Sequence, residues 1–167
     1  MSGAQLLINS LPYLEELERK AVVDEARSFV GTPFKHQAGV KGAGVDCAHL
    51  ISEVYRVVGL MPAITYPVYG RDWFRHAANE EKYIVEVAKL YFREIAESEA
   101  GVGDWMAVKI GRAYAHCAII TEVQNGKPSK GINAWPTKEK VWEVDIQQDT
   151  VFSGHLKRYF SPWNRGK

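Results

Sequence analysis

The sequence predicts an α+β fold in which N-terminal helices pack on an antiparallel sheet. Three segments before residue 100 carry apolar side chains at helical spacing. After the sequence GVGD at 101–104, short runs of β-branched and aromatic residues are separated by glycine, asparagine or proline. Helices that lead and strands that follow are typical of α+β proteins. A length of 167 residues with 46% hydrophobic content is enough for one core, so we expect residues 1–167 to form a single domain.

The first predicted helix covers residues 10–30. Its sequence SLPYLEELERKAVVDEARSFV has apolar side chains at helical spacing, Ser10 and Pro12 lie near its start, and Gly31 supplies a stop. Residues 31–44 are too rich in glycine for a regular element. We expect a long, shaped loop there, of the kind that often carries function.

The second predicted helix is the best-marked element of the chain. Asp46 is a natural N-cap, which places its neighbour Cys47 in the first turn, and Gly59 ends the helix. Its apolar residues recur at i, i+3, i+4, i+7, i+8 and i+11, at Cys47, Leu50, Ile51, Val54, Tyr55 and Val58.

The rest of the chain divides into an irregular part, a third helix and four strands. Residues 61–79 contain prolines, glycine and aromatics without a period, and we expect no regular structure there. Apolar spacing predicts a helix over 80–96. The strands are expected in DWMAVKI, HCAIITEV, KGINAW and VWEVDI, as an antiparallel meander.

Composition excludes several classes of function. Twenty-one basic against twenty acidic residues give a net charge of +1, so no positive field favours nucleic acid or an anionic membrane. No apolar run approaches the roughly 18 residues of a membrane span, and no signal peptide is recognised at the N-terminus. We expect a soluble protein made in the cytoplasm. Two cysteines without CxxC or clustered Cys/His spacing predict neither a disulfide framework nor a metal site.

Cys47 is the first candidate for chemistry. Unpaired amides and the positive end of the helix dipole favour a thiolate in a first turn. Such a position can lower a cysteine pKa from about 8.5 to roughly 3.5–7.5, the more so beside an imidazolium. A structural explanation is also open, because Cys47 lies on the apolar stripe of its helix and free cysteines are often buried.

His116 and Asn133 are candidates for the base and for the group that orients it. A nucleophilic thiol needs a base, and the base needs a fixed ring orientation. His116 begins the apolar strand HCAIIT, and Asn133 in GINAW could accept the proton of the far ring nitrogen. Taken singly, His116 could be a hydrogen-bonded core histidine and Asn133 a turn or edge residue. Cys117 points away from His116 along the strand and is expected in the core.

The order of these segments resembles a known family. GTPFKHQAGVKGAGVDCAHL, then VGDWMAV, AHCAII and GINAW, resemble the NlpC-type cell-wall peptidases, a branch of the papain-like cysteine peptidases. The likeness is closest to members encoded by phages and prophages near their tail genes, and it extends from about residue 20 to about residue 160.

The resemblance implies a papain-like fold with a catalytic cysteine at a helix N-terminus. Cys47 would attack an amide carbonyl in a peptidoglycan peptide, His116 would be general base and acid, and Asn133 would take the third place, where family members often have histidine. The Cys47 amide would donate to the oxyanion. No cofactor or metal is implied.

Four further residues are expected to contact substrate. The resemblance links Asp46 to a free amine of the substrate peptide, although helix capping is the simpler role. His36 in the glycine loop could line the cleft, and Trp135 could share the face of Asn133. Phe34 stands nearest to a loop tyrosine of the family and lacks its hydroxyl.

Other residues depart from the family or have no assigned role. Ala48 and His49 replace the small hydroxyl or glycine that often follows the cysteine, so a cleavage site is not transferred. Because positions two apart on a helix do not face each other, we expect His49 to face solvent or a loop rather than Cys47.

Three functions fit these residues. The first is a thiol hydrolase of cell-wall peptides, associated with a phage tail. The second is a structural or assembly protein of a phage tail, in contact with other tail proteins, that keeps the fold. The third is a thiol acyltransferase with the same site and a different acyl acceptor.

Overall fold

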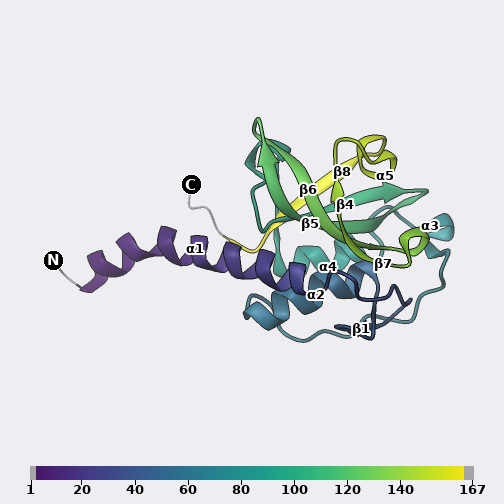
Figure 1. The fold of residues 1–167 in the computed structure, drawn as a ribbon, viewed down its shortest axis with the longest axis horizontal. Coiled ribbons are helices and arrows are strands. Elements are labelled where there is room, and N and C mark those ends of the chain that lie inside the picture. Colours follow the sequence, from purple (N-terminus) through teal and green to yellow (C-terminus); the bar gives the residue numbers. More distant parts are fainter. Residues whose placement is uncertain (1–2, 164–167) are drawn as a thin grey trace.

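The computed structural model describes residues 3–163 and has a layer of helices beside an antiparallel sheet (Figure 1). The predicted α+β fold is confirmed. The helices are α1 (Gly3–Ser28), α2 (Cys47–Val58), α3 (Trp73–His76), α4 (Ile84–Tyr91) and α5 (Thr150–Ser153), with 3₁₀ turns η1 (Glu97–Glu99) and η2 (Pro136–Lys138). The strands are β1 (Gly39–Val40), β2 (Gly44–Val45), β3 (Arg93–Ile95), β4 (Trp105–Ile110), β5 (Ala113–Gln124), β6 (Lys127–Trp135), β7 (Lys140–Asp145) and β8 (Lys157–Ser161).

The main sheet has six strands in the order β3-β8-β4-β5-β6-β7. The predicted meander is confirmed as β4 to β7, in which each strand pairs with the next one along the chain. Val108 lies opposite His116, and Asn133 lies opposite Trp142. Within the described residues 3–163, β3 and β8 are additional strands that periodicity did not predict.

Helix α1 begins earlier than predicted and contains Pro12 inside it. Proline removes one backbone donor and usually ends a helix. Here the part of α1 before Pro12 extends away from the rest of the molecule (Figure 1). The predicted start near Ser10 is therefore wrong.

Helix α2 confirms the predicted boundaries. The Asp46 carboxylate accepts the His49 amide at 3.0 Å, which is an N-cap bond, and Gly59 ends the helix with φ of 86°. Only residues without a Cβ adopt that left-handed conformation at little cost. The two ends of the helix are therefore fixed by the sequence.

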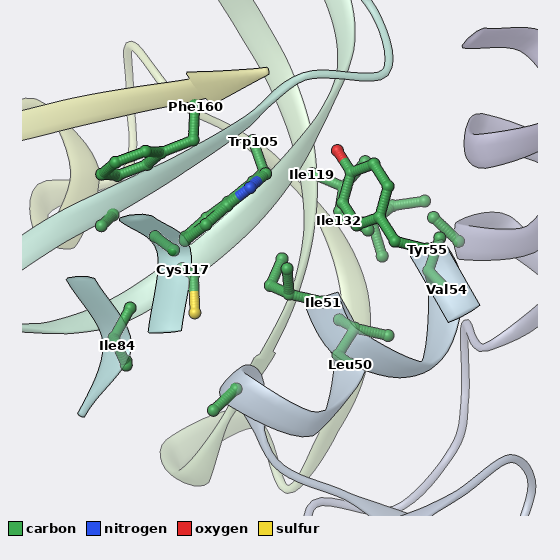
Figure 2. Packing of buried hydrophobic residues seen from close by; sticks show 14 of the residues in the cluster. Leu50, Ile51, Val54, Tyr55, Ile84, Trp105, Cys117, Ile119, Ile132 and Phe160 are labelled. Carbon is green, nitrogen blue, oxygen red and sulfur yellow. The ribbon is translucent and has the colours of Figure 1, made fainter. Parts of the chain in front are cut away.

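The apolar face of α2 packs on β5 and β6. Leu50 and Val54 are fully buried, and they share one core with Ile119 and Ile132 of the sheet (Figure 2). Cys117 lies in the same core, as predicted. Burying large aliphatic side chains of this kind stabilises the fold by roughly 1.5–3 kcal/mol each. This packing fixes where the first turn of α2 meets the sheet.

The predicted helix over 80–96 is wrong at both ends. Tyr83 has φ of 64°, which is outside the helical region, and α4 starts only at Ile84. Phe92 is extended, and Arg93–Ile95 form β3, which pairs with β8. The pairing covers the free edge of β8 and buries Ile95, and these gains override local helical spacing.

The glycine loop over 31–44 is largely irregular, as predicted, with a small β1–β2 hairpin. The segment 61–79 is irregular apart from α3. Among residues 3–163, no helix has the length and apolar character needed to cross a bilayer.

Leu50→Ala tests the packing of α2. We expect it to lower the free energy of unfolding by about 2–5 kcal/mol, because the buried side chain leaves a cavity. Val57→Ala on the same helix is the control: Val57 is 53% exposed, and its truncation should change stability by less than about 0.5 kcal/mol. Urea denaturation of both variants measures this. Equal losses would contradict the assigned face.

Candidate active site

Cys47 is the first residue of α2 and is partly buried. Its sulfur lies 3.7 Å from the carbonyl oxygen of Ala115 on β5. The N-cap carboxylate takes the amide of His49, and within residues 3–163 the amides of Cys47 and Ala48 have no hydrogen-bond acceptor. Cys47 therefore lies in a first turn whose amides are unpaired, as the sequence predicted for its position.

His116 and Asn133 lie on the adjacent strands β5 and β6 and contact each other. The His116 Nε2 donates to Asn133 Oδ1 at 3.1 Å, and both residues are 1% exposed. Asn133 Nδ2 donates to the carbonyl of Trp142 at 3.3 Å, which orients the amide with its oxygen toward the ring. With the proton on Nε2, Nδ1 of a neutral His116 is free to accept a proton.

Two aromatic rings hold the His116 imidazole in place. The Trp135 ring is 4.4 Å from it, edge to face, and the Phe152 ring is 5.3 Å away. Trp135 therefore shares the face of Asn133, as its spacing predicted. Ring packing and the Asn133 hydrogen bond together leave the imidazole one orientation.

The pKa of the Cys47 thiol is lowered to about 6. The largest cause is a hydrogen bond from the Cys117 thiol; burial opposes ionisation, while a hydrogen bond and the charge of His116 favour the thiolate. The same burial and the negative charge on Cys47 raise the pKa of Cys117 far above its ordinary value. Of the two thiols, Cys47 is therefore the one that ionises near neutral pH.

Cys117 is a core residue with a polar contact that the sequence did not predict. In the structure its thiol donates to the backbone carbonyl of Cys47 at 3.4 Å, and the same proton is the one that would turn to the Cys47 sulfur when that group ionises. His116 and Cys117 point to opposite faces of β5, yet both act on Cys47, because the first turn of α2 meets the start of this strand. Strand alternation gave the direction of the Cys117 side chain but not its partner.

Asp46 is buried and accepts four hydrogen bonds. The donors are the amide of Gln37 at 2.8 Å, the amide of His49 at 3.0 Å, His49 Nδ1 at 2.7 Å and the hydroxyl of Tyr69 at 2.6 Å. Burial would raise the pKa of Asp46, but the hydrogen bonds and charge of His49 and the hydroxyl of Tyr69 outweigh it and hold the pKa low. The predicted capping role is confirmed.

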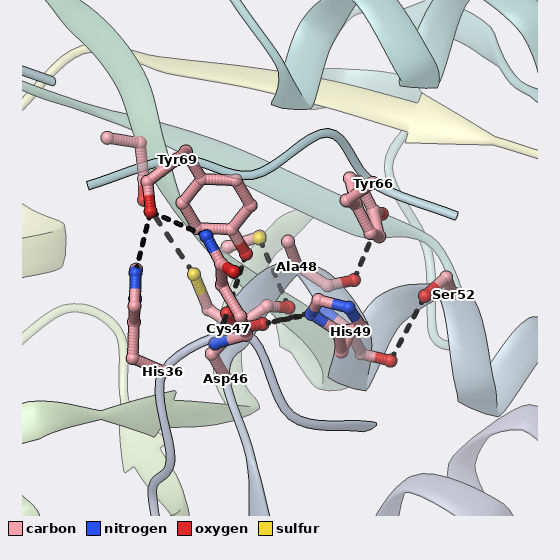
Figure 3. Close-up of polar contacts among 11 residues, drawn as sticks. His36, Asp46, Cys47, Ala48, His49, Ser52, Tyr66 and Tyr69 are labelled. Carbon is pink, nitrogen blue, oxygen red and sulfur yellow. Dashed lines mark hydrogen bonds and ion pairs between the residues drawn. The ribbon is translucent and has the colours of Figure 1, made fainter. Parts of the chain in front are cut away.

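His49 contacts Asp46 and a loop, and its side chain is partly exposed. Its ring packs on Tyr66 of the 61–79 segment at 4.8 Å (Figure 3). The expectation that His49 faces solvent or a loop rather than Cys47 is confirmed, since its ring contacts the loop and its side chain is 19% exposed. The spacing of three residues from Asp46, rather than two from Cys47, determines its contact.

The 61–79 segment lies over the start of α2. Tyr66 donates its hydroxyl to the Ala48 carbonyl at 3.2 Å, and the Tyr69 carbonyl accepts His36 Nε2 at 2.8 Å and Gln37 Nε2 at 2.5 Å (Figure 3). Tyr69 is only 8% exposed. No local signal in the sequence marked these tyrosines, because their partners lie in other segments.

The remaining predicted residues lie around this arrangement. Phe34 packs against the main core, and His36 is partly buried against the Tyr69 ring, 5.1 Å away. Across residues 3–163, no three His, Cys, Asp or Glu side chains group as metal ligands.

Comparison with known proteins gives a fold. No protein-family model matches this sequence, and no curated protein matches it. The NlpC/p60 domain of the peptidoglycan hydrolase SagA matches with a TM-score of 0.52 and 20% identity, over 84% of this chain and 96% of that one. The peptidoglycan hydrolase RipB from Mycobacterium tuberculosis matches with a TM-score of 0.56 and 16% identity, over 88% of this chain and 65% of that one.

A third similar structure is described differently. RipD from Mycobacterium tuberculosis is a non-catalytic NlpC/p60 domain protein adapted to peptidoglycan binding; it matches with a TM-score of 0.55 and 14% identity, over 87% of this chain and 98% of that one. This chain therefore has the fold of NlpC/p60 domains, a fold found in both hydrolases and a non-catalytic protein.

The pH dependence of alkylation tests the state of Cys47. Iodoacetamide should modify Cys47 with a midpoint near pH 6, because its lowered pKa keeps the thiolate above that pH and loses it as pH falls through it. Rates against pH, with the modified residue identified by mass spectrometry, measure this. A midpoint near the ordinary value of about 8.5 would contradict it.

Two variants test whether Cys117 lowers the pKa of Cys47. Cys117→Ala should move the midpoint upward, since the largest cause of the shift is removed. Cys117→Ser keeps a donor at the same place and should stay closer to the wild type. A midpoint that stays near pH 6 in both variants would assign the shift to His116 and the helix alone.

Asp46→Ala tests the buried carboxylate. We expect a loss of stability on the order of 3 kcal/mol, because a cap disappears and the Tyr69, Gln37 and His49 donors lose their acceptor. Asp46→Asn keeps a good cap and should lose less. Urea denaturation compares them, and equal losses would mean that the shared carboxylate acceptor rather than the helix cap accounts for the effect.

Proposed function

We propose that this protein is a thiol hydrolase that cleaves an amide bond in bacterial cell-wall peptides, with Cys47, His116 and Asn133 as its catalytic residues. The observation that carries the proposal is the hydrogen bond from His116 to Asn133 beside a helix-terminal thiol of lowered pKa. A nucleophile, a base and an orienting group are the parts that amide cleavage by a thiol needs. The shared fold with the hydrolases SagA and RipB supports the substrate class.

Acylation starts from the Cys47 thiolate. It attacks the carbonyl carbon of the amide, and the electron pair moves to the oxygen, where the free amide of Cys47 donates a hydrogen bond. His116, which holds the former thiol proton on Nδ1, gives that proton to the leaving nitrogen as the carbon–nitrogen bond breaks. The products are a thioester on Cys47 and a free amine.

Deacylation uses the same residues in reverse roles. His116 takes a proton from water, the resulting hydroxide attacks the thioester, and the carbon–sulfur bond breaks to restore the thiolate. Asn133 keeps the imidazole oriented throughout, because its oxygen accepts the Nε2 proton and its nitrogen is tied to Trp142. Neither acylation nor deacylation, as written here, requires a cofactor.

The substrate-contacting roles are part of the same proposal. His36 and Phe34 approach the site from the loop before α2, and Trp135 approaches it from the end of β6 beside the His116 ring. Asp46 would reach a substrate amine only if Tyr69 released one of its oxygens, since that carboxylate already has four donors. We therefore place Asp46 as the residue that positions the helix start.

The phage association stays a prediction from the resemblance. A place in a phage particle would bring the protein to the wall by way of tail proteins. A structural role in a tail is the second candidate. The non-catalytic RipD has the same fold, which supports a role without catalysis.

Digestion of muropeptides tests the proposal. Wild-type protein should release peptide fragments that mass spectrometry identifies, and Cys47→Ala should release none. Asn133→Ala should lower kcat by on the order of tenfold or more, because the ring loses its orientation. Asn133→Asp keeps the accepting oxygen and should retain more activity.

The outcome separates the alternatives. Identical digests from the wild type and Cys47→Ala would end the hydrolase proposal and favour the structural role. Amide or ester products formed in the presence of added amines or alcohols would identify an acyltransferase instead.

A further inference from the structure

A hollow of about 500 Å³ lies beside the candidate active site. Three separate stretches form its walls: the loop before α2, the 61–79 segment, and the η2 turn after β6. Its lining residues are Phe34, Lys35, His36, Arg71, Pro136 and Glu139. Phe34 and His36 are proposed above as substrate contacts, whereas the other four residues have no part in the proposed function, and the hollow is larger than a water molecule needs.

Backbone contacts hold the walls together. Phe34 donates its amide to the Glu139 carbonyl at 2.8 Å, and Pro33 forms a β-bridge with Lys140, so the loop is fixed to the turn after β6. His36 donates to the Tyr69 carbonyl at 2.8 Å, which fixes the 61–79 segment two residues before Arg71. The shape of the hollow therefore rests on hydrogen bonds to main-chain carbonyls, one of them donated by the His36 side chain.

The charge in the hollow is unbalanced. Lys35 and Arg71 bring two positive charges, and Glu139 brings one negative charge. Among the described residues, neither Lys35 nor Arg71 forms an ion pair, whereas Arg158, elsewhere on the surface, pairs with both Glu81 and Glu94. The Lys35 stem packs over Gly44, where a Cβ would lie 2.3 Å from it, so the base of this side chain has a defined place.

The hollow adjoins the reacting groups. Pro136 directly follows Trp135, whose ring packs on His116 at 4.4 Å. On the opposite wall, Lys35 donates its amide to the carbonyl of Val45 at 3.1 Å, two residues before Cys47. An extended peptide rises by about 3.3 Å per residue, so a chain whose amide lies at Cys47 enters the hollow within a few residues.

We propose that this hollow binds a carboxylate of the peptide substrate, through Lys35 and Arg71, next to the bond that is cleaved. The inference rests on the proposed function, and it names the substrate class as a peptide with a free side-chain or terminal carboxylate. Arginine gives two parallel donors to a carboxylate and lysine adds a point charge. Glu139 excludes a second anion and limits the site to one carboxylate.

Binding to the inactive Cys47→Ala protein tests the proposal without turnover. The probes are the stem tetrapeptide of peptidoglycan and the same peptide with its carboxylates amidated, and calorimetry gives Kd. The free carboxylate form should bind at least tenfold more tightly, and added salt should weaken only that form. Equal affinity for both peptides, or no binding of the carboxylate form, would overturn the proposal.

Matched charge variants test whether Lys35 and Arg71 cause the difference in affinity between the two peptides. Lys35→Gln with Arg71→Gln, in the Cys47→Ala background, should abolish the difference between the two peptides. Lys127→Gln with Lys20→Gln removes the same charge from other surfaces and should preserve it. Glu139→Gln should tighten binding of the carboxylate form or leave it unchanged. The same loss in the Lys127/Lys20 variant would assign the discrimination to overall charge and overturn the proposed site.

The result does not depend on hydrolysis. If the two peptides are distinguished but the wild type cleaves neither, the hollow is a carboxylate site and the hydrolase proposal fails. If the wild type cleaves both at equal kcat/KM, the hydrolase proposal stands and the carboxylate site fails.

Discussion

The Asp46 carboxylate is the contact on which the rest of the site depends. One buried group caps α2, receives the loop before it through Gln37, and receives the 61–79 segment through Tyr69. The helix start and two segments that are irregular or glycine-rich thus acquire fixed positions from a single acceptor. A buried carboxylate is costly unless it is fully hydrogen-bonded, so the partners stabilise the charge as much as the charge holds them.

The second constraint is the pairing of β5 with β6. It sets His116 beside Asn133, and the β6–β7 register then sets Asn133 opposite Trp142, whose carbonyl orients the amide. The packing of α2 on these strands brings the thiol to the same place. The position of each group thus follows from a regular element, which gives more precise placement than a loop would.

The two thiols, Cys47 and Cys117, have pKa values shifted in opposite directions by their neighbours. Both lie in the same core, yet the donor bond from Cys117 and the charge of His116 favour the anion on Cys47, while burial and that anion keep Cys117 protonated. A buried residue that packs like an aliphatic side chain also acts as a hydrogen-bond donor to the nucleophile candidate. The glycine-rich loop before α2 also helps to place Cys47, because it lets the chain turn tightly into the capped helix.

The sequence by itself determined the α+β class, the boundaries of α2, the cap at Asp46 and the β4–β7 meander. These follow from periodicity, capping chemistry and turn residues, all of which act over a few residues. The triad candidates also came from the sequence, since Cys47 has a local helix signal and the order of motifs resembles a known family. Their mutual contacts did not, because they join residues far apart in the chain.

Only the tertiary structure decided the secondary structure of residues 80–96, the partners of His49 and Cys117, and the position of Tyr69. Helical spacing over 80–96 was overridden by the free edge of β8, which a strand covers better than a helix. Tyr69 lies in an irregular segment, and its hydroxyl finds Asp46 only after the chain has folded. Local patterns specify elements, whereas burial and hydrogen-bond satisfaction across distant segments specify the site.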